Sequence, residues 1–259
     1  MKFLIVFSLT LCFSLFVNAA TPDDDAAPYI KIFAGDKSLH HTITEDVEWM
    51  GLSDPKLFDP IEQRLLSEYE HAKIYSAERN RIARYIKDLG YSGQSKYIPT
   101  LKIMAADVTY ERYAESALKD NIRYQKWNSI ISNRANFDEK NSDDANRVAN
   151  MLRADDLELN ALGARQVYFK FFKNAYLVDL LAQKVKASYM LAEDAPGELA
   201  QAVAWMVRGL SSARDEKYYA LVLKIESDAP NKTVRKHAGK SKMRDYVKKA
   251  APKYRDEEL

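Results

Sequence analysis

The stretch of sequence that decides the fold is residues 81–105, RIARYIKDLGYSGQSKYIPTLKIMA. Its first half carries an apolar stripe at helical spacing: Ile82, Tyr85, Ile86 and Leu89. Residues three and four positions apart share one face of a helix, so this stripe predicts an amphipathic helix. A polar turn and Lys96-Tyr97 follow, and Tyr97, Leu101 and Met104 then form a second stripe. The stretch therefore predicts a helical hairpin with one apolar face that must be buried against a neighbour.

A second stretch repeats this arrangement at residues 202–226, AVAWMVRGLSSARDEKYYALVLKIE, with each position 121 residues after its counterpart. The matching apolar positions are Val203, Met206, Val207 and Leu210, followed by Tyr218, Val222 and Ile225. Lys217-Tyr218 takes the place of Lys96-Tyr97, but Arg214-Asp215-Glu216 replaces Gly93-Gln94-Ser95, so we expect a different turn in the second copy. Two amphipathic hairpins that agree by accident are the alternative explanation.

The chain from residue 59 onward has helical patterning throughout. Capping residues and breakers predict helix starts near residues 60, 77, 96, 110, 143, 156, 175, 198, 216 and 231. Residues 167–172, VYFKFF, are strand-prone, but their neighbours favour a buried helix. Residues 21–58 are expected to be irregular and acidic, with Tyr29–Phe33 as the candidate for a short strand. We predict an all-α fold of about nine or ten helices, stacked as an α-α superhelix over residues 59–259.

The first 20 residues have the layout of a secretory signal peptide. Lys2 supplies the positive start, residues 3–17 are almost all apolar, and Ala19-Ala20 offers the small residues of a cleavage site. A membrane anchor is the weaker alternative, because the apolar run is shorter than the ~20 residues of a spanning helix. We therefore expect a periplasmic or secreted protein with no membrane span after the signal is removed. In a eukaryotic secretory route, Asn231-Lys232-Thr233 would be a glycosylation acceptor.

Composition narrows the class of protein further. The chain has 8 Gly, 8 Pro and a net charge of +2, which excludes collagen-like and largely disordered proteins. Its single cysteine, Cys12, lies inside the expected signal peptide. The mature chain would therefore hold no disulfide and no cysteine-based metal site, and its stability must come from packing.

Three stretches resemble a known family. They are residues 89–101, LGYSGQSKYIPTL; residues 216–238; and residues 49–62, where WMGLSDP precedes FDPIE. The order of turn, Lys-Tyr, apolar helix and basic helix resembles HEAT-like repeats of secreted bacterial proteins that lack an assigned activity. The resemblance covers residues 49–120 and 198–247, and it departs at residues 214–216, where the Gly-Gln-Ser turn is replaced. It implies an α-solenoid that binds proteins, and it supplies no catalytic residue.

Motifs for catalysis, metals and cofactors are lacking in the sequence. The four histidines are His40, His41, His71 and His237, and none belongs to a His-Glu-x-x-His pattern. Ser53 and Ser116 each precede a lysine by three residues, but the companion motifs of that serine chemistry are missing. Glu62, Glu68 and Glu70 lie on one expected helix, as solvated charges commonly do. We therefore expect no enzyme activity, no cofactor and no metal.

Charge is unevenly distributed along the chain. Residues 21–60 hold nine acidic and three basic residues, whereas residues 232–259 hold ten basic and four acidic residues. The last helix would turn its bases outward, and this predicts contact with an anionic partner through four residues. They are Lys232, Arg235, Lys236 and Lys240. A solvated cap on the last repeat is the alternative explanation. The signal peptide argues against nucleic acid as the partner.

These observations predict a non-catalytic, exported module that binds or scaffolds a protein of the cell envelope. A solenoid offers a long rigid surface for such work. A cell-wall-active hydrolase or lyase with a carboxylate catalyst is the rival hypothesis, and a purely structural helical domain is a third. Two carboxylates converging in a deep pocket would favour the enzyme, whereas an open groove would favour binding.

Overall fold

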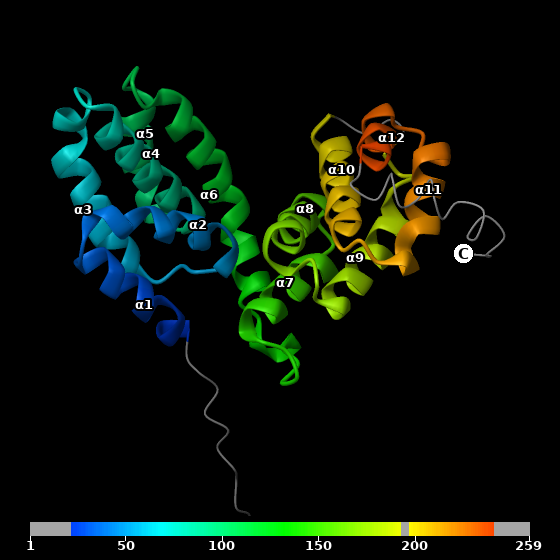
Figure 1. Cartoon of the computed structure of the whole chain (residues 1–259). Coiled ribbons are helices and arrows are strands. Elements are labelled where there is room, and N and C mark those ends of the chain that lie inside the picture. The colour runs from blue at the N-terminus through cyan, green and yellow to red at the C-terminus, as the bar shows by residue number, and fades with distance from the viewer. Residues whose placement is uncertain (1–21, 193–196, 241–259) are drawn as a thin grey trace, which may run out of the picture.

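The computed structural model describes residues 22–192 and 197–240, and within them it is all-α (Figure 1). Twelve α-helices and no strand occur in these ranges. The helices are α1 (Pro22–Ala34), α2 (His40–Met50), α3 (Pro55–Ala72), α4 (Ser76–Tyr91), α5 (Ile98–Ala105), α6 (Glu111–Ile131), α7 (Asp143–Arg153), α8 (Leu157–Gln166), α9 (Ala175–Ser188), α10 (Gly197–Ser212), α11 (Tyr219–Asp228) and α12 (Lys232–Gly239). The all-α prediction is confirmed. The expected signal peptide, residues 1–20, lies outside the described residues, as does the basic segment after residue 240.

The two helices beyond the expected ten are α1 and α2, so the prediction of an irregular segment over residues 21–58 is wrong. The strand considered at Tyr29–Phe33 is also wrong, because these residues lie within α1. Acidic residues of this segment form ion pairs with arginines that are distant in the sequence. Asp25 binds the Arg147 guanidinium of α7 at 2.5 Å and that of Arg134 at 2.8 Å. These contacts hold the N-terminal helices on the rest of the molecule.

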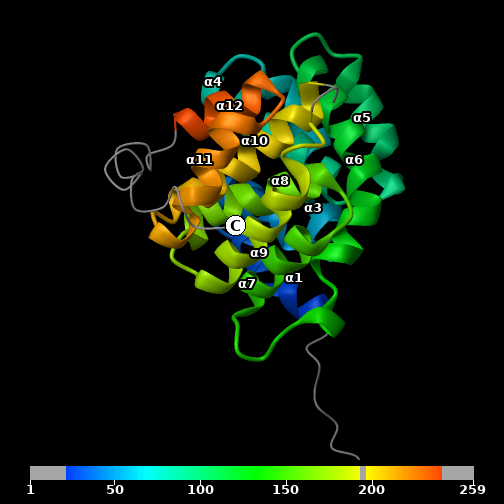
Figure 2. The same ribbon diagram turned by 90° about the vertical axis from the view of Figure 1, so that its right-hand side faces the viewer.

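Each helix packs mainly against the helices that are next to it, or next but one, in the sequence. Helix α4 contacts α2, α3 and α6, and α10 contacts α8, α9 and α12. In Figure 1, α1–α5 gather on one side and α8–α12 on the other, with α6 and α7 between them. Figure 2 looks at the C-terminal side, where α11 and α12 lie beside α10. The buried side chains of both sides form one continuous apolar core.

The two repeated stretches occupy matching local structures. All eight residues of their first stripes are buried: Ile82, Tyr85, Ile86, Leu89, Val203, Met206, Val207 and Leu210. In the first copy, Asp59 of the preceding helix accepts a hydrogen bond from the Tyr97 hydroxyl at 2.7 Å and forms an ion pair with Lys96 at 2.6 Å. In the second copy, Asp179 receives the same two contacts, from Tyr218 at 2.6 Å and from Lys217 at 2.5 Å.

The turn within the repeat is also the same in both copies, contrary to our expectation. Gly93 has a φ of 65°, and Arg214, which stands in its place, has a φ of 51°. Both residues are followed by a short 3₁₀ helix, Ser95–Tyr97 in one copy and Glu216–Tyr218 in the other. Packing around the turn therefore imposes a left-handed conformation on an arginine, at a position where glycine has no steric cost.

The VYFKFF stretch is helical as predicted, but it is not buried. Val167–Phe171 form a π-helical turn that continues α8, and Val167 alone among these five is buried. Phe169 is 63% exposed. A π-turn holds one residue more than an α-turn and so rotates the following side chains around the helix axis. This rotation brings aromatic side chains to the surface beside α10.

Candidate functional site

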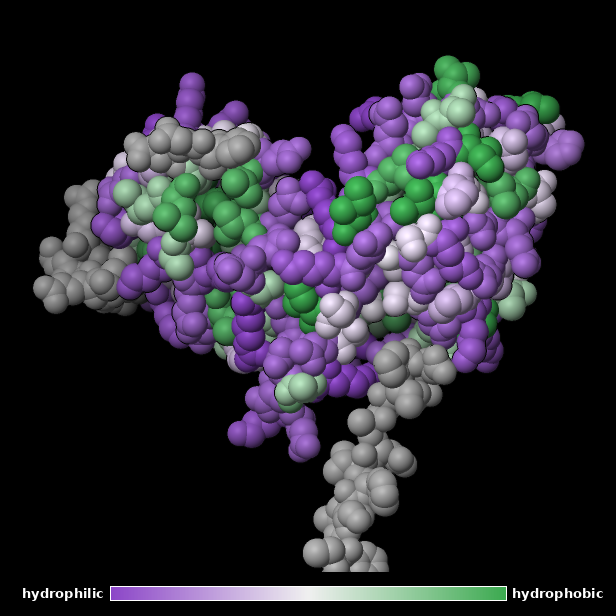
Figure 3. Space-filling model, turned by 180° about the vertical axis from the view of Figure 1, so that it is seen from behind, coloured by the Kyte–Doolittle hydropathy of each residue, from purple (hydrophilic) through white to green (hydrophobic). Residues whose placement is uncertain are grey.

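A groove of about 500 Å³ opens between the two sides of the molecule. Its walls come from α6, α8 and α10, and single residues from α2 and α4 close its inner end. Figure 3, which views the molecule from behind, shows the surface notched between the two sides. The lining residues that carry the argument below are Glu48, Tyr91, Asp120, Arg123, Tyr124, Trp127, Glu158, Arg165, Glu198, Gln201 and Trp205.

Aromatic side chains form one wall of the groove and are held rigidly. The Tyr124 ring lies 5.0 Å from the Tyr91 ring and 5.1 Å from the Trp127 ring, measured between centroids. The Tyr124 hydroxyl donates to the backbone oxygen of Glu48 at 2.6 Å, and Trp127 Nε1 donates to Asp156 at 2.9 Å. Since the Tyr124 and Trp127 rings are each fixed at both the face and the polar end, the wall is preorganised for contact.

Charged side chains in the groove are largely paired. Arg123 binds Glu158 through two nitrogens, with Nε–Oε2 at 3.0 Å and Nη2–Oε1 at 3.2 Å. Arg165 binds Glu48 at 3.0 Å across the groove's inner end. Four carboxylates line the groove, including those of Asp120 and Glu198, against two guanidinium groups. The groove therefore presents an excess of negative charge.

Asp120 is a groove carboxyl whose ionisation this environment alters. Burial raises the pKa of its carboxyl, and Glu48 adds to the rise. The Arg123 guanidinium, 3.7 Å away, and a hydrogen bond from Ser116 at 3.4 Å oppose it. A raised pKa in a cleft is the property of a general acid, but the same shift arises in any partly buried carboxyl.

A second cavity of about 530 Å³ lies further along α10, against α12 and the π-turn. Its lining residues are Tyr168, Gln201, Arg208, Ser211, Ser212, Thr233, Lys236, His237 and Lys240. Gln201 also lines the groove, so the two hollows meet along α10. Among residues 22–192 and 197–240, no carboxylate lines this second cavity.

The four residues expected to contact a partner divide between two places. Lys236 and Lys240 line the second cavity. Lys232 is exposed at the start of α12, outside the cavity. Arg235 has a structural role, because its guanidinium donates to the backbone oxygens of Ala229 and Pro230 and closes the turn before α12. Arg208 and Tyr168 were missed, because no short-range pattern links them to the last helix.

The residues considered for catalysis or metal binding have structural partners. His40 is buried and shares a 2.6 Å hydrogen bond with the Tyr85 hydroxyl. Glu62 accepts from Thr100, Glu68 pairs with Lys37 and Arg81, and Glu70 pairs with Lys73. Within residues 22–192 and 197–240, no three histidine or carboxylate side chains cluster in a way that would hold a metal ion.

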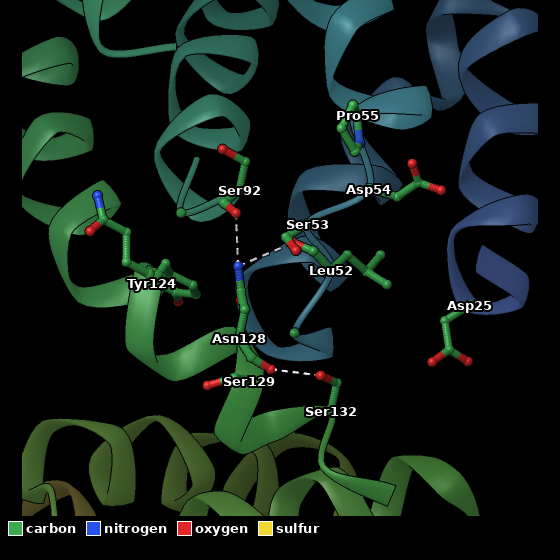
Figure 4. Close-up of a pocket in the computed structure, with 13 residues that line it drawn as sticks. Asp25, Leu52, Ser53, Asp54, Pro55, Ser92, Tyr124, Asn128, Ser129 and Ser132 are labelled. Atoms are coloured by element: carbon green, nitrogen blue, oxygen red, sulfur yellow. Dashed lines mark hydrogen bonds between the residues drawn. The ribbon is translucent and has the colours of Figure 1, made fainter. Parts of the chain in front are cut away.

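A third hollow, of about 390 Å³, surrounds a turn clamp centred on Asn128 (Figure 4). The Asn128 amide nitrogen lies 3.2 Å from the Leu52 carbonyl oxygen, 3.0 Å from that of Tyr91 and 2.9 Å from that of Ser92. It thereby ties the turn after α2 and the turn after α4 to α6. Backbone groups at helix ends have no partner within the helix, so a buried amide supplies it. This hollow follows from turn structure.

Replacing Asn128 by Asp should destabilise the protein by on the order of 3 kcal/mol, because three backbone acceptors lose their donor and face a carboxylate. Urea denaturation measures this change. Asn80→Asp on exposed α4 surface is the matched control, and we expect it to alter the free energy of unfolding by less than about 0.5 kcal/mol. Equal effects of both substitutions would contradict the clamp.

Comparison with known protein families, with curated proteins and with solved structures finds no match for this chain. Among the helices in the described part of the chain, none combines the length and the apolar character that crossing a membrane requires. What the groove does is therefore inferred from its own geometry and charge.

Proposed function

We propose that this protein is a non-catalytic, exported binding module whose groove between α6, α8 and α10 holds an extended, basic segment of a protein partner. The observation that carries the proposal is an open groove lined by fixed aromatic rings and an excess of carboxylates. The expected signal peptide supports export to the periplasm or the medium. The matching turns and Asp-Tyr-Lys contacts of the two copies support a HEAT-like superhelix.

The chemistry of the groove favours a polypeptide ligand with cationic side chains. Tryptophan, tyrosine and arginine are the residues that most often dominate the free energy of protein association. Trp205 is the half-buried aromatic ring of the groove, and its exposed part is the surface on which a lysine or arginine side chain can pack. Trp127 and Tyr124 are 7% and 2% exposed and form the apolar backing of the groove. Glu198 is exposed, and no ion pair to it occurs within the described residues, so its carboxylate is available to a cation. Glu158 and Glu48 are already bound to arginines and would fix the shape of the wall.

The experiment is a titration of tryptophan fluorescence with two extended peptides of equal length, one lysine-rich and one glutamate-rich. We expect the lysine-rich peptide to bind and the glutamate-rich peptide not to bind. Glu198→Lys, which reverses one charge in the groove, should weaken binding at least about fivefold, because an attraction of up to about 1 kcal/mol is replaced by repulsion between like charges. The control Glu115→Lys makes the same change on exposed α6 surface outside the groove and should leave the affinity unchanged.

The rival hypothesis of a wall-active hydrolase rests on Asp120 and its raised pKa. Incubating the purified protein with cell-wall polymer separates the two. Release of soluble fragments that is abolished by Asp120→Asn would overturn the binding proposal. Equal affinity for both peptides would also overturn it, because charge would then play no part in recognition.

A further inference from the structure

The second cavity gathers cations that are not paired with a carboxylate of the described residues. Arg208 of α10, Lys236 of α12 and Lys240, which follows α12, line it, and within the described residues none of the three forms an ion pair with a carboxylate. Elsewhere in this chain charged residues commonly pair; Arg165 and Lys217 are examples. Like charges repel one another, so three unpaired cations around one hollow destabilise it unless an anion is bound.

Arg208 is held in a fixed orientation at the wall of this cavity. Its guanidinium carbon lies 4.6 Å from the Tyr168 ring centroid and 4.7 Å from that of Trp205, and Nη2 donates to the Tyr168 hydroxyl at 3.2 Å. A guanidinium held against two aromatic rings loses little entropy on binding an anion and retains further N–H donors. The exposed π-turn, which supplies Tyr168, therefore serves to position Arg208.

The electrostatic potential of the cavity acts on His237. Burial lowers the pKa of its imidazole, and Arg208, Lys240 and Lys236 lower it further. The imidazole is therefore neutral at pH 7 and offers one donor and one acceptor.

Hydroxyl groups in the cavity indicate what accompanies the anion. The Ser211 hydroxyl donates to the Val207 carbonyl at 2.8 Å, and the Ser212 hydroxyl donates to the Gly209 carbonyl at 2.6 Å. Both serines thus have only acceptor lone pairs left for a ligand, and these suit the hydroxyls of a polyol. The volume of about 530 Å³ lies in the range of small-molecule sites and exceeds the needs of a bare phosphate ion.

We propose that this cavity binds a phosphorylated polyol, with its phosphoryl group between Arg208, Lys236 and Lys240 and its hydroxyls on Ser211, Ser212 and Gln201. Two sources share this chemistry, a free sugar phosphate and the phosphorylated headgroup of a lipid. The proposal does not depend on the groove's peptide ligand, because the cations and serines that carry it do not line the groove; only Gln201 lines both hollows.

The test uses the full mature chain and four probes. Isothermal titration calorimetry compares glucose phosphate with glucose, and sedimentation compares phosphatidylcholine vesicles with and without phosphatidylinositol phosphate. We expect binding of at least one phosphorylated probe and no binding of its unphosphorylated counterpart. Binding of glucose phosphate identifies a soluble ligand, and binding to the phosphorylated vesicles alone identifies a lipid headgroup; both outcomes support the site.

The variants separate this site from general positive charge. Lys236→Gln together with Lys240→Gln removes two cations from the cavity and should weaken binding at least about tenfold, since each contributes a charge-assisted hydrogen bond. Lys232→Gln removes one cation from the same helix outside the cavity and should change the affinity less than about twofold. The proposal is overturned if no phosphorylated probe binds, if glucose binds as well as glucose phosphate, or if Lys232→Gln weakens binding as much as the double variant.

Discussion

Replacing Asp88 by Asn should stabilise this protein at neutral and alkaline pH and remove much of the pH dependence of its unfolding. Asp88 lies on α4 and is 1% exposed. One carboxylate oxygen accepts a hydrogen bond from Thr44 at 3.2 Å, and the other has no partner. Burial raises the pKa of Asp88 to about 8, against the opposing effects of Thr44, Arg84 and Lys87. The protein therefore folds around a carboxyl that is mostly protonated at pH 7.

The sign of the effect follows from the direction of the pKa shift. The folded state binds the Asp88 proton more tightly than the unfolded state, whose pKa is the ordinary 3.8. The contribution of the protonated Asp88 carboxyl to the free energy of unfolding is fully present below pH 3.8. It is lost as the pH rises to about 8, by about 1.4 kcal/mol per pH unit. Asparagine keeps the shape and cannot ionise, so it avoids this loss.

Urea denaturation of both proteins at pH 5 and pH 8 measures the prediction. The advantage of Asp88→Asn over the parent should grow by up to about 4 kcal/mol between these pH values. Asp155→Asn, at an exposed position, is the control and should show no such growth. An advantage of Asp88→Asn that does not change with pH would mean that Asp88 ionises freely in the folded state.

Local patterns in the sequence predict most of the helices, because helical periodicity and capping residues act over a few positions. Asp143 and Ala175, for example, begin helices at the positions expected for them. The failure at α1 and α2 has a physical cause. The acidic residues suggested an irregular segment, whereas Asp25 is bound by Arg134 and Arg147, more than a hundred residues away. A long-range ion pair leaves no mark on local spacing.

The groove and the second cavity could not be predicted from the sequence for a related reason. The groove draws Glu48, Asp120, Glu158 and Glu198 from four helices, and only the packing of those helices brings them together. Arg208 stands next to Val207 in a buried stripe, where a sequence pattern gives it no special role. Lys236 and Lys240 could be named from the sequence because they belong to one run of charged residues. Charge composition thus located part of the cationic cavity, and tertiary structure supplied the remainder.

Gly93→Ala should be among the most destabilising single substitutions in this chain, whereas Arg214→Gly, at the equivalent position of the other copy, should be stabilising. Gly93 has a φ of 65°, and a Cβ atom there would lie 2.5 to 2.7 Å from the backbone of Tyr124 and Gln125. Left-handed strain and a collision with backbone atoms together should cost at least about 3 kcal/mol.

Arg214 has the same left-handed backbone strain, because its φ is 51°. Its side chain is already accommodated by the fold, so no collision with neighbouring backbone adds to that strain. Glycine relieves that strain, so Arg214→Gly should raise the free energy of unfolding by about 0.5 to 1 kcal/mol. Gly197→Ala is the control, because a Cβ atom there meets no neighbour within 4 Å. Thermal and urea denaturation of the three variants measure these changes. If both residues serve one turn geometry, Gly93→Ala should lower the free energy of unfolding and Arg214→Gly should raise it. A loss of stability in Arg214→Gly would mean that the two copies reach similar backbone angles for unrelated reasons.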